Sequence, residues 1–330
     1  MNFEPSSPRK TLVYKRAYRS KFTHIRSNVD QQSTVTLTTP RYDPANTHPY
    51  YSGFLAMKNK QPKIPLPYKL EERIRQRVAE ENQSIQSQYP LPDEHQVETL
   101  YDIDHVYVAV NLGLPPRYKH SPIYITKESS INAAITFHTQ DENYQICILN
   151  FTDSTEPGKG FKYGHRAQES SNCLQTLIYP TLVDNRLYGD NAVNGRSAEG
   201  SNTMIYSSNI YVIRDEGCKR VKNPFLINII SSTPVNNQKR VVPNADRIME
   251  DRIRKIITLA AAKKNDVLVI GDFGCGKCQN DPKVIAQIFR KVLVTEGMKN
   301  HFTAVVIPIY SGPSSFNAFR SAIPDIKLII

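Results

Sequence analysis

Two glycine-containing loops carry the residues whose types and spacing suggest chemistry. The first loop lies within FTDSTEPGKGFKYGHRAQESS at 151–171, where Gly158 and Gly160 flank Lys159 after an apolar run that ends at Phe151. Glycines let successive backbone N–H groups approach an anion without interference from Cβ atoms, and a following helix adds its positive end. The loop therefore predicts an anion site, although a Gly-Lys-Gly triplet alone is more often an ordinary turn.

The second loop lies in VLVIGDFGCGKCQNDPKVIAQIF at 267–289 and follows another buried apolar run. It ends in Asn280, Asp281 and Pro282, an order that predicts a helix start, because Asp or Asn caps the first backbone N–H groups and proline suits the first helical position. Ligands of open α/β sheets collect where a strand runs into such a loop. The second loop is therefore a second candidate for phosphate contact.

Residues 271–278 also satisfy the pattern G-x-x-x-x-G-K of a nucleotide hydrolase, with Cys278 where Ser or Thr would bind Mg²⁺. In such an enzyme the lysine opens the helix, whereas here the helix start is displaced to about Asn280. Only 52 residues follow Cys278 in this chain of 330, which is too little for the sheet of a nucleotidase. We reject that interpretation.

Cys275 and Cys278 form a C-x-x-C pair, which raises the alternatives of thiol chemistry or a metal site. A redox pair favours the start of a βαβ unit with its first cysteine at a helix N-terminus, and this pair comes late in the chain. No second Cys/His pair at ligand spacing accompanies it. We therefore expect no metal and no cofactor.

Short apolar runs alternate with helical patterns from about residue 67 onward, and this order predicts a three-layer α/β domain with a mixed, mostly parallel central sheet flanked by helices. An amphipathic helix is expected at 68–85. Strands are expected at 122–126, 145–151, 209–213, 225–231, 266–270 and 303–309. Further helices are expected near 129–137, 166–178, 246–262 and 282–294.

Composition separates a basic N-terminal segment from this domain. The net charge is +11, and residues 1–66 hold 11 Lys/Arg against 3 Asp/Glu, a balance of +8 that leaves +3 for the other 264 residues. We expect residues 1–66 to be a disordered extension and 67–330 to be the folded domain. This basic segment, which also contains tyrosines, could contact nucleic acid or be a solvated tail. A third alternative is a mitochondrial presequence, but Pro5 and Pro8 argue against it.

The remaining bulk features point to an intracellular protein, in the cytoplasm or the nucleus. The mean hydropathy is -0.46, and no apolar run approaches the roughly 18 residues of a membrane helix. No secretory signal opens the sequence. The 5 cysteines form no recognisable disulfide framework, which favours a reducing compartment. We expect no contact with a membrane.

Together the two loops resemble the microbial-type poly(ADP-ribose) glycohydrolase family, whose loops read PGGGF, a short spacer, GARAQEES, and later LVLGAWGCGVFGNDP. The matching stretches here are PGKGF at 157–161, GHRAQESS at 164–171 and LVIGDFGCGKCQNDP at 268–282, and the spacer needs no gap. Flanking matches follow in family order, among them RQRVAEENQSI at 75–85, TKESSINAA at 126–134, MIYSSNIYVIRD at 204–215 and STPVNN at 232–237. The resemblance covers residues 67–325.

The resemblance implies a macrodomain-like fold in which ADP-ribose lies across the strand ends with its diphosphate between the two loops. Lys159 departs from the family's middle glycine, and the sequence leaves open whether it adds a charge to the phosphate or crowds the ribose. The expected partners are ADP-ribose, its polymer and ADP-ribosylated proteins. The residues expected to bind ligand are Asn150, Gly158, Lys159, Gly160, Phe161, Gly274, Cys275, Gly276, Lys277 and Asn280.

A second departure affects the residue that the resemblance makes catalytic. In the family, the second glutamate of Gln-Glu-Glu protonates the leaving ribose oxygen and activates water, but the gapless match assigns Gln168, Glu169 and Ser170 to these three positions. A serine hydroxyl is too weak an acid for this step near neutral pH. Gln168 and Glu169 have the alternative role of capping the helix that begins there.

Three hypotheses follow from these patterns. The first is a family member that binds ADP-ribose or the ends of its polymer, with hydrolysis weak or lost because of Ser170. The second is an active glycohydrolase that uses Glu169 or another acid, such as Asp153 or Glu156. The third is a scaffold whose basic residues 1–66 contact nucleic acid.

Overall fold

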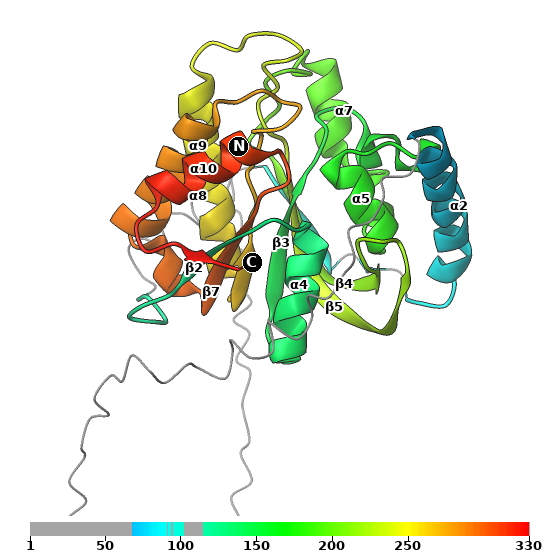
Figure 1. Ribbon diagram of the computed structural model, residues 1–330. Coiled ribbons are helices and arrows are strands. Elements are labelled where there is room, and N and C mark those ends of the chain that lie inside the picture. The colour runs from blue at the N-terminus through cyan, green and yellow to red at the C-terminus, as the bar shows by residue number, and fades with distance from the viewer. Residues whose placement is uncertain (1–67, 91, 94, 102–114, 330) are drawn as a thin grey trace, which may run out of the picture. The chain divides into compact units, whose positions relative to one another are not determined.

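Eight strands form one sheet at the centre of the fold (Figure 1). The computed structural model describes residues 68–329 apart from 91, 94 and 102–114. The strands lie in the order β1-β4-β5-β3-β6-β7-β2-β8. Their bounds are β1 Val97–Leu100, β2 Ile123–Thr126, β3 Ile146–Phe151, β4 Met204–Arg214, β5 Arg220–Ser232, β6 Val267–Val269, β7 Ala304–Pro308 and β8 Lys327–Leu328.

The sheet is mixed and mostly parallel, as the sequence predicts. The pairs β1/β4 and β4/β5 are antiparallel, and every pair from β5 across to β8 is parallel. Parallel neighbours end at the same edge of a sheet, so the chain leaves β3 and β6 side by side. This arrangement brings the two glycine loops together.

Helices cover both faces of the sheet (Figure 1). One face carries α8 Ala245–Ala262, α9 Pro282–Phe289 and α10 Pro313–Ala322, and α9 continues into a π-helical segment, Arg290–Thr295. The other face carries α2 Tyr68–Gln86, α4 Ser130–Gln140, α5 Gln168–Gln175, α6 Tyr179–Leu182 and α7 Arg186–Val193. Two 3-10 segments, η1 Pro157–Tyr163 and η3 Met298–His301, complete the set.

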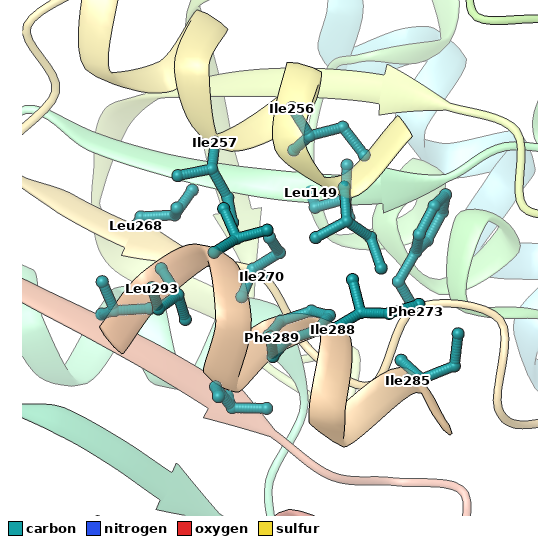
Figure 2. Close-up of a cluster of buried hydrophobic side chains, with 14 of the residues drawn as sticks. Leu149, Ile256, Ile257, Leu268, Ile270, Phe273, Ile285, Ile288, Phe289 and Leu293 are labelled. Atoms are coloured by element: carbon teal, nitrogen blue, oxygen red, sulfur yellow. The ribbon is translucent and has the colours of Figure 1, made fainter. Parts of the chain in front are cut away.

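Alternation along the strands divides the core between the two faces. In β3, Cys147 and Leu149 point toward α8 and α9, while Ile146 and Ile148 point toward the opposite helices. Figure 2 shows the first of these clusters, where side chains from α8 and α9 meet those of β3 and β6. Each fully buried aliphatic side chain stabilises the fold by about 1.5–3 kcal/mol. The site is therefore built on rigid strands.

The predicted elements are confirmed in kind, and most differ only at their ends. The helix expected at 166–178 ends earlier, at Gln175, because Thr176 is extended and pairs with Val212. Sequence patterns missed β1, α6, α7, α10 and β8. The predicted extension at residues 1–66 lies outside the described residues. Within the described part of the chain, no helix has the length and apolarity required to cross a bilayer.

Candidate functional site

The two glycine loops meet where β3 and β6 end. Loop 1, residues 152–167, follows β3, and loop 2, residues 271–281, follows β6. The rings of Phe151 and Phe273 pack edge to face with centroids 5.3 Å apart. A Cβ atom on Gly271 would lie 2.9 Å from the Phe151 ring, so glycine is required for this close approach. The structure thus brings together the two loops that the sequence singles out.

Loop 1 has an unusual backbone at its centre. Gly158, Lys159 and Gly160 take φ values of 72°, 42° and 69°, all in the left-handed region. A Cβ atom on Gly160 would lie 2.4 Å from Nδ1 of His165, so the flanking glycine fits the packing as well as the backbone. For a non-glycine residue such as Lys159, this conformation costs roughly 1–2 kcal/mol. The chain therefore holds a strained lysine at the middle of the loop.

Ser170 contacts that strained residue directly. Its side chain is fully buried, and Oγ donates a hydrogen bond of 2.8 Å to the carbonyl oxygen of Lys159. The two positions that depart from the expected pattern, Lys159 in loop 1 and Ser170 in α5, are thus joined by one hydrogen bond. The hydroxyl group at the expected acid position is engaged by the backbone.

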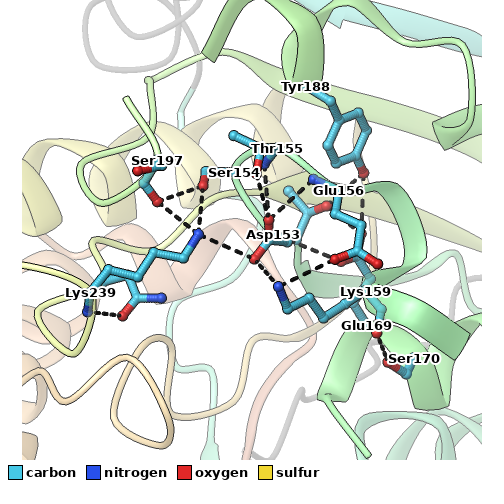
Figure 3. A network of polar contacts seen from close by, with 12 residues as sticks. Asp153, Ser154, Thr155, Glu156, Lys159, Glu169, Ser170, Tyr188, Ser197 and Lys239 are labelled. Atoms are coloured by element: carbon cyan, nitrogen blue, oxygen red, sulfur yellow. Dashed lines mark hydrogen bonds and ion pairs between the residues drawn. The ribbon is translucent and has the colours of Figure 1, made fainter. Parts of the chain in front are cut away.

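Glu169 is fully buried, as its neighbour Ser170 is, and contacts the start of loop 1 (Figure 3). Its carboxyl group accepts hydrogen bonds from Thr152 Oγ1, from the backbone N–H of Asp153 at 2.9 Å, and from Tyr188 Oη at 3.1 Å. Burial raises the pKa of Glu169 to about 7, although these hydrogen bonds oppose the rise. Glu169 is therefore a group that exchanges a proton near neutral pH.

Gln168 and Asn150 join α5 to the sheet. Gln168 Oε1 accepts from the backbone N–H of Phe151 at 2.8 Å, and its Nε2 donates to the carbonyl of Leu149 at 2.9 Å. Asn150 is fully buried, and its Oδ1 accepts from Asn172 at 2.9 Å. The N-cap of α5 is Ala167, which has no capping side chain, so neither Gln168 nor Glu169 caps the helix. Gln168 instead joins α5 to β3, and Glu169 joins α5 to the start of loop 1.

Asp153 is the other carboxylate beneath loop 1. Burial raises its pKa, but the hydrogen bond from Lys159 at 2.8 Å, the N–H of Thr155 and the charge of Lys239 outweigh burial, and the net pKa lies below its ordinary value. A carboxyl group held ionised is poorly suited to donate a proton. Glu156 is exposed and lies 3.5 Å from Lys159 Nζ. These contacts argue against either residue as a replacement acid.

Loop 2 is held mainly by amide and backbone contacts. Asn280 is buried, and its Nδ2 donates to the carbonyl groups of Val235 and Gly274 at 2.8 and 3.0 Å. Asp281 caps α9 by accepting from the N–H of Lys283 at 2.9 Å, which confirms the predicted helix start. Buried Asp272 accepts a hydrogen bond from Ser311 Oγ, and burial raises its pKa to about 6.

The other predicted ligand-binding residues are distributed over both loops. Phe161 is buried and packs against the ring of Tyr179 at 4.6 Å. Cys275 is half-buried, whereas Gly276 and Lys277 are exposed on loop 2. All of them lie on the loops that leave the adjacent ends of β3 and β6.

The C-x-x-C pair has none of the properties of a reactive site. Burial raises the pKa of Cys278 to about 11 and raises that of Cys275 further, so both thiols stay protonated at neutral pH. The described residues contain no cluster of three or more His, Cys, Asp or Glu side chains able to hold a metal ion. Neither observation favours thiol or metal chemistry at loop 2.

The volume of a surface hollow does not by itself identify the functional site. A hollow of about 1230 Å³ lies beside α8 and α9 and is lined by residues such as Arg196, Glu250 and Lys291, none of which belongs to loop 1 or α5. Its Glu250 is already paired with Lys291 at 2.5 Å and with Arg254 at 2.8 Å. The glycine loops therefore remain the better supported site.

Sequence reasoning missed three contributors to the site: Thr152, Tyr188 and Lys239. Thr152 and Tyr188 surround the carboxyl group of Glu169, and Lys239 Nζ lies 3.7 Å from Asp153. Thr152 directly follows β3, so its place on the loop was a usable signal. No local pattern marks Tyr188 or Lys239, which the fold brings in from residues far along the chain.

Comparison with known families adds independent support for the fold. Residues 63–215, somewhat less than half of the chain, match the family model of the microbial-type PARG catalytic domain. The resemblance that the loops indicate is therefore confirmed. None of the curated proteins matches the sequence.

Solved structures of poly(ADP-ribose) glycohydrolases are similar over most of the chain. The enzyme from Thermomonospora curvata is 22% identical with a TM-score of 0.67, over 76% of this chain and 99% of that one. The structure of the same enzyme bound to the inhibitor ADP-HPD is 23% identical with a TM-score of 0.65, and the coverage of the two chains is the same. The Deinococcus radiodurans enzyme in complex with ADP-ribose is 23% identical with a TM-score of 0.62, over 71% of this chain and 98% of that one. At these identities the likeness establishes the macrodomain-like α/β fold.

Proposed function

We propose that this protein, whose residues 63–215 match the family model of the microbial-type PARG catalytic domain, binds ADP-ribose, or the chain ends of its polymer, with hydrolysis weak or lost. The observation behind weak or lost hydrolysis is Ser170. This residue occupies the expected acid position, and its hydroxyl group donates a hydrogen bond to the Lys159 carbonyl. Loss of a positioned general acid typically lowers a rate by about 10² to 10⁴-fold.

The form of the two loops supports binding of a diphosphate. Loop 1 supplies three consecutive left-handed residues, and loop 2 ends in a capped helix start at Asp281. Glycine-rich turns can direct backbone N–H groups toward an anion, although here the N–H groups of Gly158 and Lys159 already donate to Glu169 and to the Glu156 carbonyl. Both loops lie at the carboxyl ends of adjacent parallel strands, where ligands of open α/β sheets bind. The residues proposed to line the ligand are those of the two loops, from Gly158 to Phe161 and from Gly274 to Lys277, with Asn150 and Asn280 behind them.

An active hydrolase that uses Glu169 is the second candidate, and the pKa of about 7 favours it. A general acid works best when its pKa lies near the working pH. Against this role, Glu169 is fully buried and its two oxygens already accept from Thr152, Asp153 and Tyr188. Proton transfer to a ligand would require these contacts to rearrange. We therefore favour binding without efficient hydrolysis.

Calorimetric titration of the full chain with ADP-ribose tests the binding proposal. We expect measurable heat and saturable binding by the wild type. Absence of binding in a folded protein would overturn the proposal.

Release of ADP-ribose from its polymer separates the two candidates. We expect little release by the wild type and no further loss in Glu169→Gln. An active wild type whose activity disappears in Glu169→Gln would establish the second candidate in place of the first.

The basic segment of residues 1–66 supports a separate proposal, contact with nucleic acid through its 11 Lys/Arg residues. Salt-sensitive binding to DNA or RNA that disappears when residues 1–66 are deleted is the expected result. Binding that survives the deletion would contradict it.

A further inference from the structure

Two lysine ammonium groups from separate segments converge on Asp153 (Figure 3). Lys159 Nζ, from loop 1, lies 2.8 Å from Oδ2 of Asp153. Lys239 Nζ, from the segment after β5, lies 3.7 Å from the same oxygen. Lys159 departs from the family's middle glycine, and Lys239 follows the matching stretch STPVNN at 232–237. They form a cationic pair beside the proposed ligand site.

The two lysine side chains are more exposed to solvent than the carboxylate between them. The side chains of Lys159 and Lys239 are 37% and 35% exposed, whereas that of Asp153 is 8% exposed. The carboxylate therefore lies beneath the two ammonium groups. An anion that approaches from solvent meets the lysines before it meets Asp153.

Lys239 is the less neutralised of the two. Lys159 has a second carboxylate, Glu156, at 3.5 Å. The closer partners of Lys239 are uncharged: the carbonyl of Ser197 at 3.1 Å and Oγ of Ser154 at 3.5 Å. An incoming anion can therefore gain more from Lys239 than from the other lysine.

The segment that carries Lys239 is attached to loop 2. The backbone N–H of Asn237 donates to the carbonyl of Cys278 at 2.9 Å, and its Nδ2 donates to Asn280 Oδ1 at 3.4 Å. Burial is the main cause of the raised pKa of the Cys278 thiol, and the charges of Asp153, Lys239 and Lys159 also act on it. The lysine pair thus spans loop 1 and a segment fixed to loop 2.

We infer that Lys159 and Lys239 form a clamp for the diphosphate of ADP-ribose, and that Asp153 holds both ammonium groups in position before the ligand binds. This inference rests on the proposed function. Hydrogen bonds between ammonium and phosphate groups are charge-assisted and among the stronger polar contacts. A half-buried pair is screened by salt less than fully exposed charges are. Lys239 thereby becomes a binding residue that neither glycine loop contains.

Titration of the full chain with ADP-ribose at low and high salt tests the clamp. We expect Lys239→Met and Lys159→Met each to weaken binding about tenfold at low salt, with a smaller difference at high salt. Lys239→Arg, which keeps the charge, should retain most of the affinity. Lys222→Met changes an exposed lysine on the hairpin strand β5 and should leave the affinity unchanged.

Two further probes separate failure of the clamp from failure of the proposed function. Adenosine lacks phosphate, so its affinity should be equal for wild type and Lys239→Met, whereas inorganic pyrophosphate should lose affinity in the variant. Equal affinity of wild type and Lys239→Met for ADP-ribose would overturn the clamp and leave the proposed function intact. If the wild type binds pyrophosphate through Lys239 but does not bind ADP-ribose, the proposed function fails and the anion clamp stands. Thermal unfolding of each variant checks that it is folded.

Discussion

The two glycine loops leave neighbouring strands, yet they are built in different ways. Loop 2 is held by a buried amide, Asn280, and by a capped helix start at Asp281. Loop 1 is held by ionisable groups, with Glu169 buried beneath it and Asp153 paired to Lys159. The Asn280 amide contacts are indifferent to pH and salt, whereas the loop 1 contacts depend on both, and on loop 2 the contacts of Asp272 depend on pH.

This difference shows where the chain departs from the family pattern that it resembles. Loop 2 keeps the glycines and the helix start of that pattern. Both departures lie on the loop 1 side, Lys159 in loop 1 and Ser170 at the start of α5, and a hydrogen bond of 2.8 Å joins them. We interpret them as one coupled change, in which the serine hydroxyl stabilises a lysine that is strained at φ 42°.

The largest expected effect tests the rigid character of loop 2. In Gly274→Ala, the new Cβ atom would lie 2.6 Å from Asn280 Nδ2, at a φ of +83°. We expect the free energy of unfolding to fall by about 3 kcal/mol, through backbone strain and loss of the Asn280 contacts. Chemical denaturation measures this change. Gly276→Ala is the matched control, because its Cβ atom would meet nothing closer than 3.7 Å, and an equal loss there would contradict the argument.

The next effect tests the ionisable character of loop 1. The folded-state pKa of Glu169 is raised from 4.5 to about 7, so its neutral form stabilises the fold fully below about pH 4.5, and this stabilisation is lost as pH rises through 7. We expect this group to lower the wild-type stability by on the order of 3 kcal/mol between pH 5 and 8. Glu169→Gln should flatten the slope.

Asp272 supplies the comparison on loop 2. Its pKa is raised from 3.8 to about 6, so its contribution is lost over a lower pH range. Asp272→Asn should flatten the profile mainly below pH 6. A profile in Glu169→Gln that matches the wild type between pH 6 and 8 would show that Glu169 is not the group that titrates there.

A smaller effect tests the coupling within loop 1. Ser170→Ala removes the buried hydrogen bond to the Lys159 carbonyl and should lower the free energy of unfolding by about 1–2 kcal/mol. In a Lys159→Gly background the loop no longer needs support, so the same change should cost less. A double-mutant cycle measures the coupling energy. Additive effects would mean that the two departures are independent.

The smallest expected effect contrasts the lysines of the two loops. Lys277 is exposed on loop 2 and forms no ion pair with any described residue. We expect Lys277→Ala to change the stability by less than about 0.5 kcal/mol. Thermal unfolding at two salt concentrations measures it, and a loss that disappears at high salt would reveal an ion pair at this lysine.

Much of the fold could be predicted from the sequence because its strands and helices have clear periodicity. The buried strands β3 and β6 and the helix start at Asp281 are local features, and the structure confirms them. The end of α5 was missed because Thr176 pairs with Val212, a contact between distant residues that no local pattern encodes. Short elements such as α7 were missed for the same reason, since packing against the sheet determines them.

The candidate site was likewise only partly predictable from the sequence. The glycine loops and the Gln168-Glu169-Ser170 run were visible in the sequence because neighbouring residues form them. The direction of each side chain was not, since adjacent residues of α5 face different partners: Gln168 contacts β3, and Ser170 contacts loop 1. Lys239 and Tyr188 reach the site only through the fold. Prediction from sequence therefore ends where tertiary contacts begin.

The most direct test of the central claim is the rate at which ADP-ribose is released from its polymer by the wild type, by Ser170→Glu and by Ser170→Glu/Lys159→Gly. Our account predicts that the wild type binds but releases little, and that the double variant gains about 10²-fold or more by regaining a general acid in a relaxed loop. Ser170→Glu alone should gain less, because the buried serine position lies against Lys159. Fast release by the wild type, unchanged in both variants, would contradict the account.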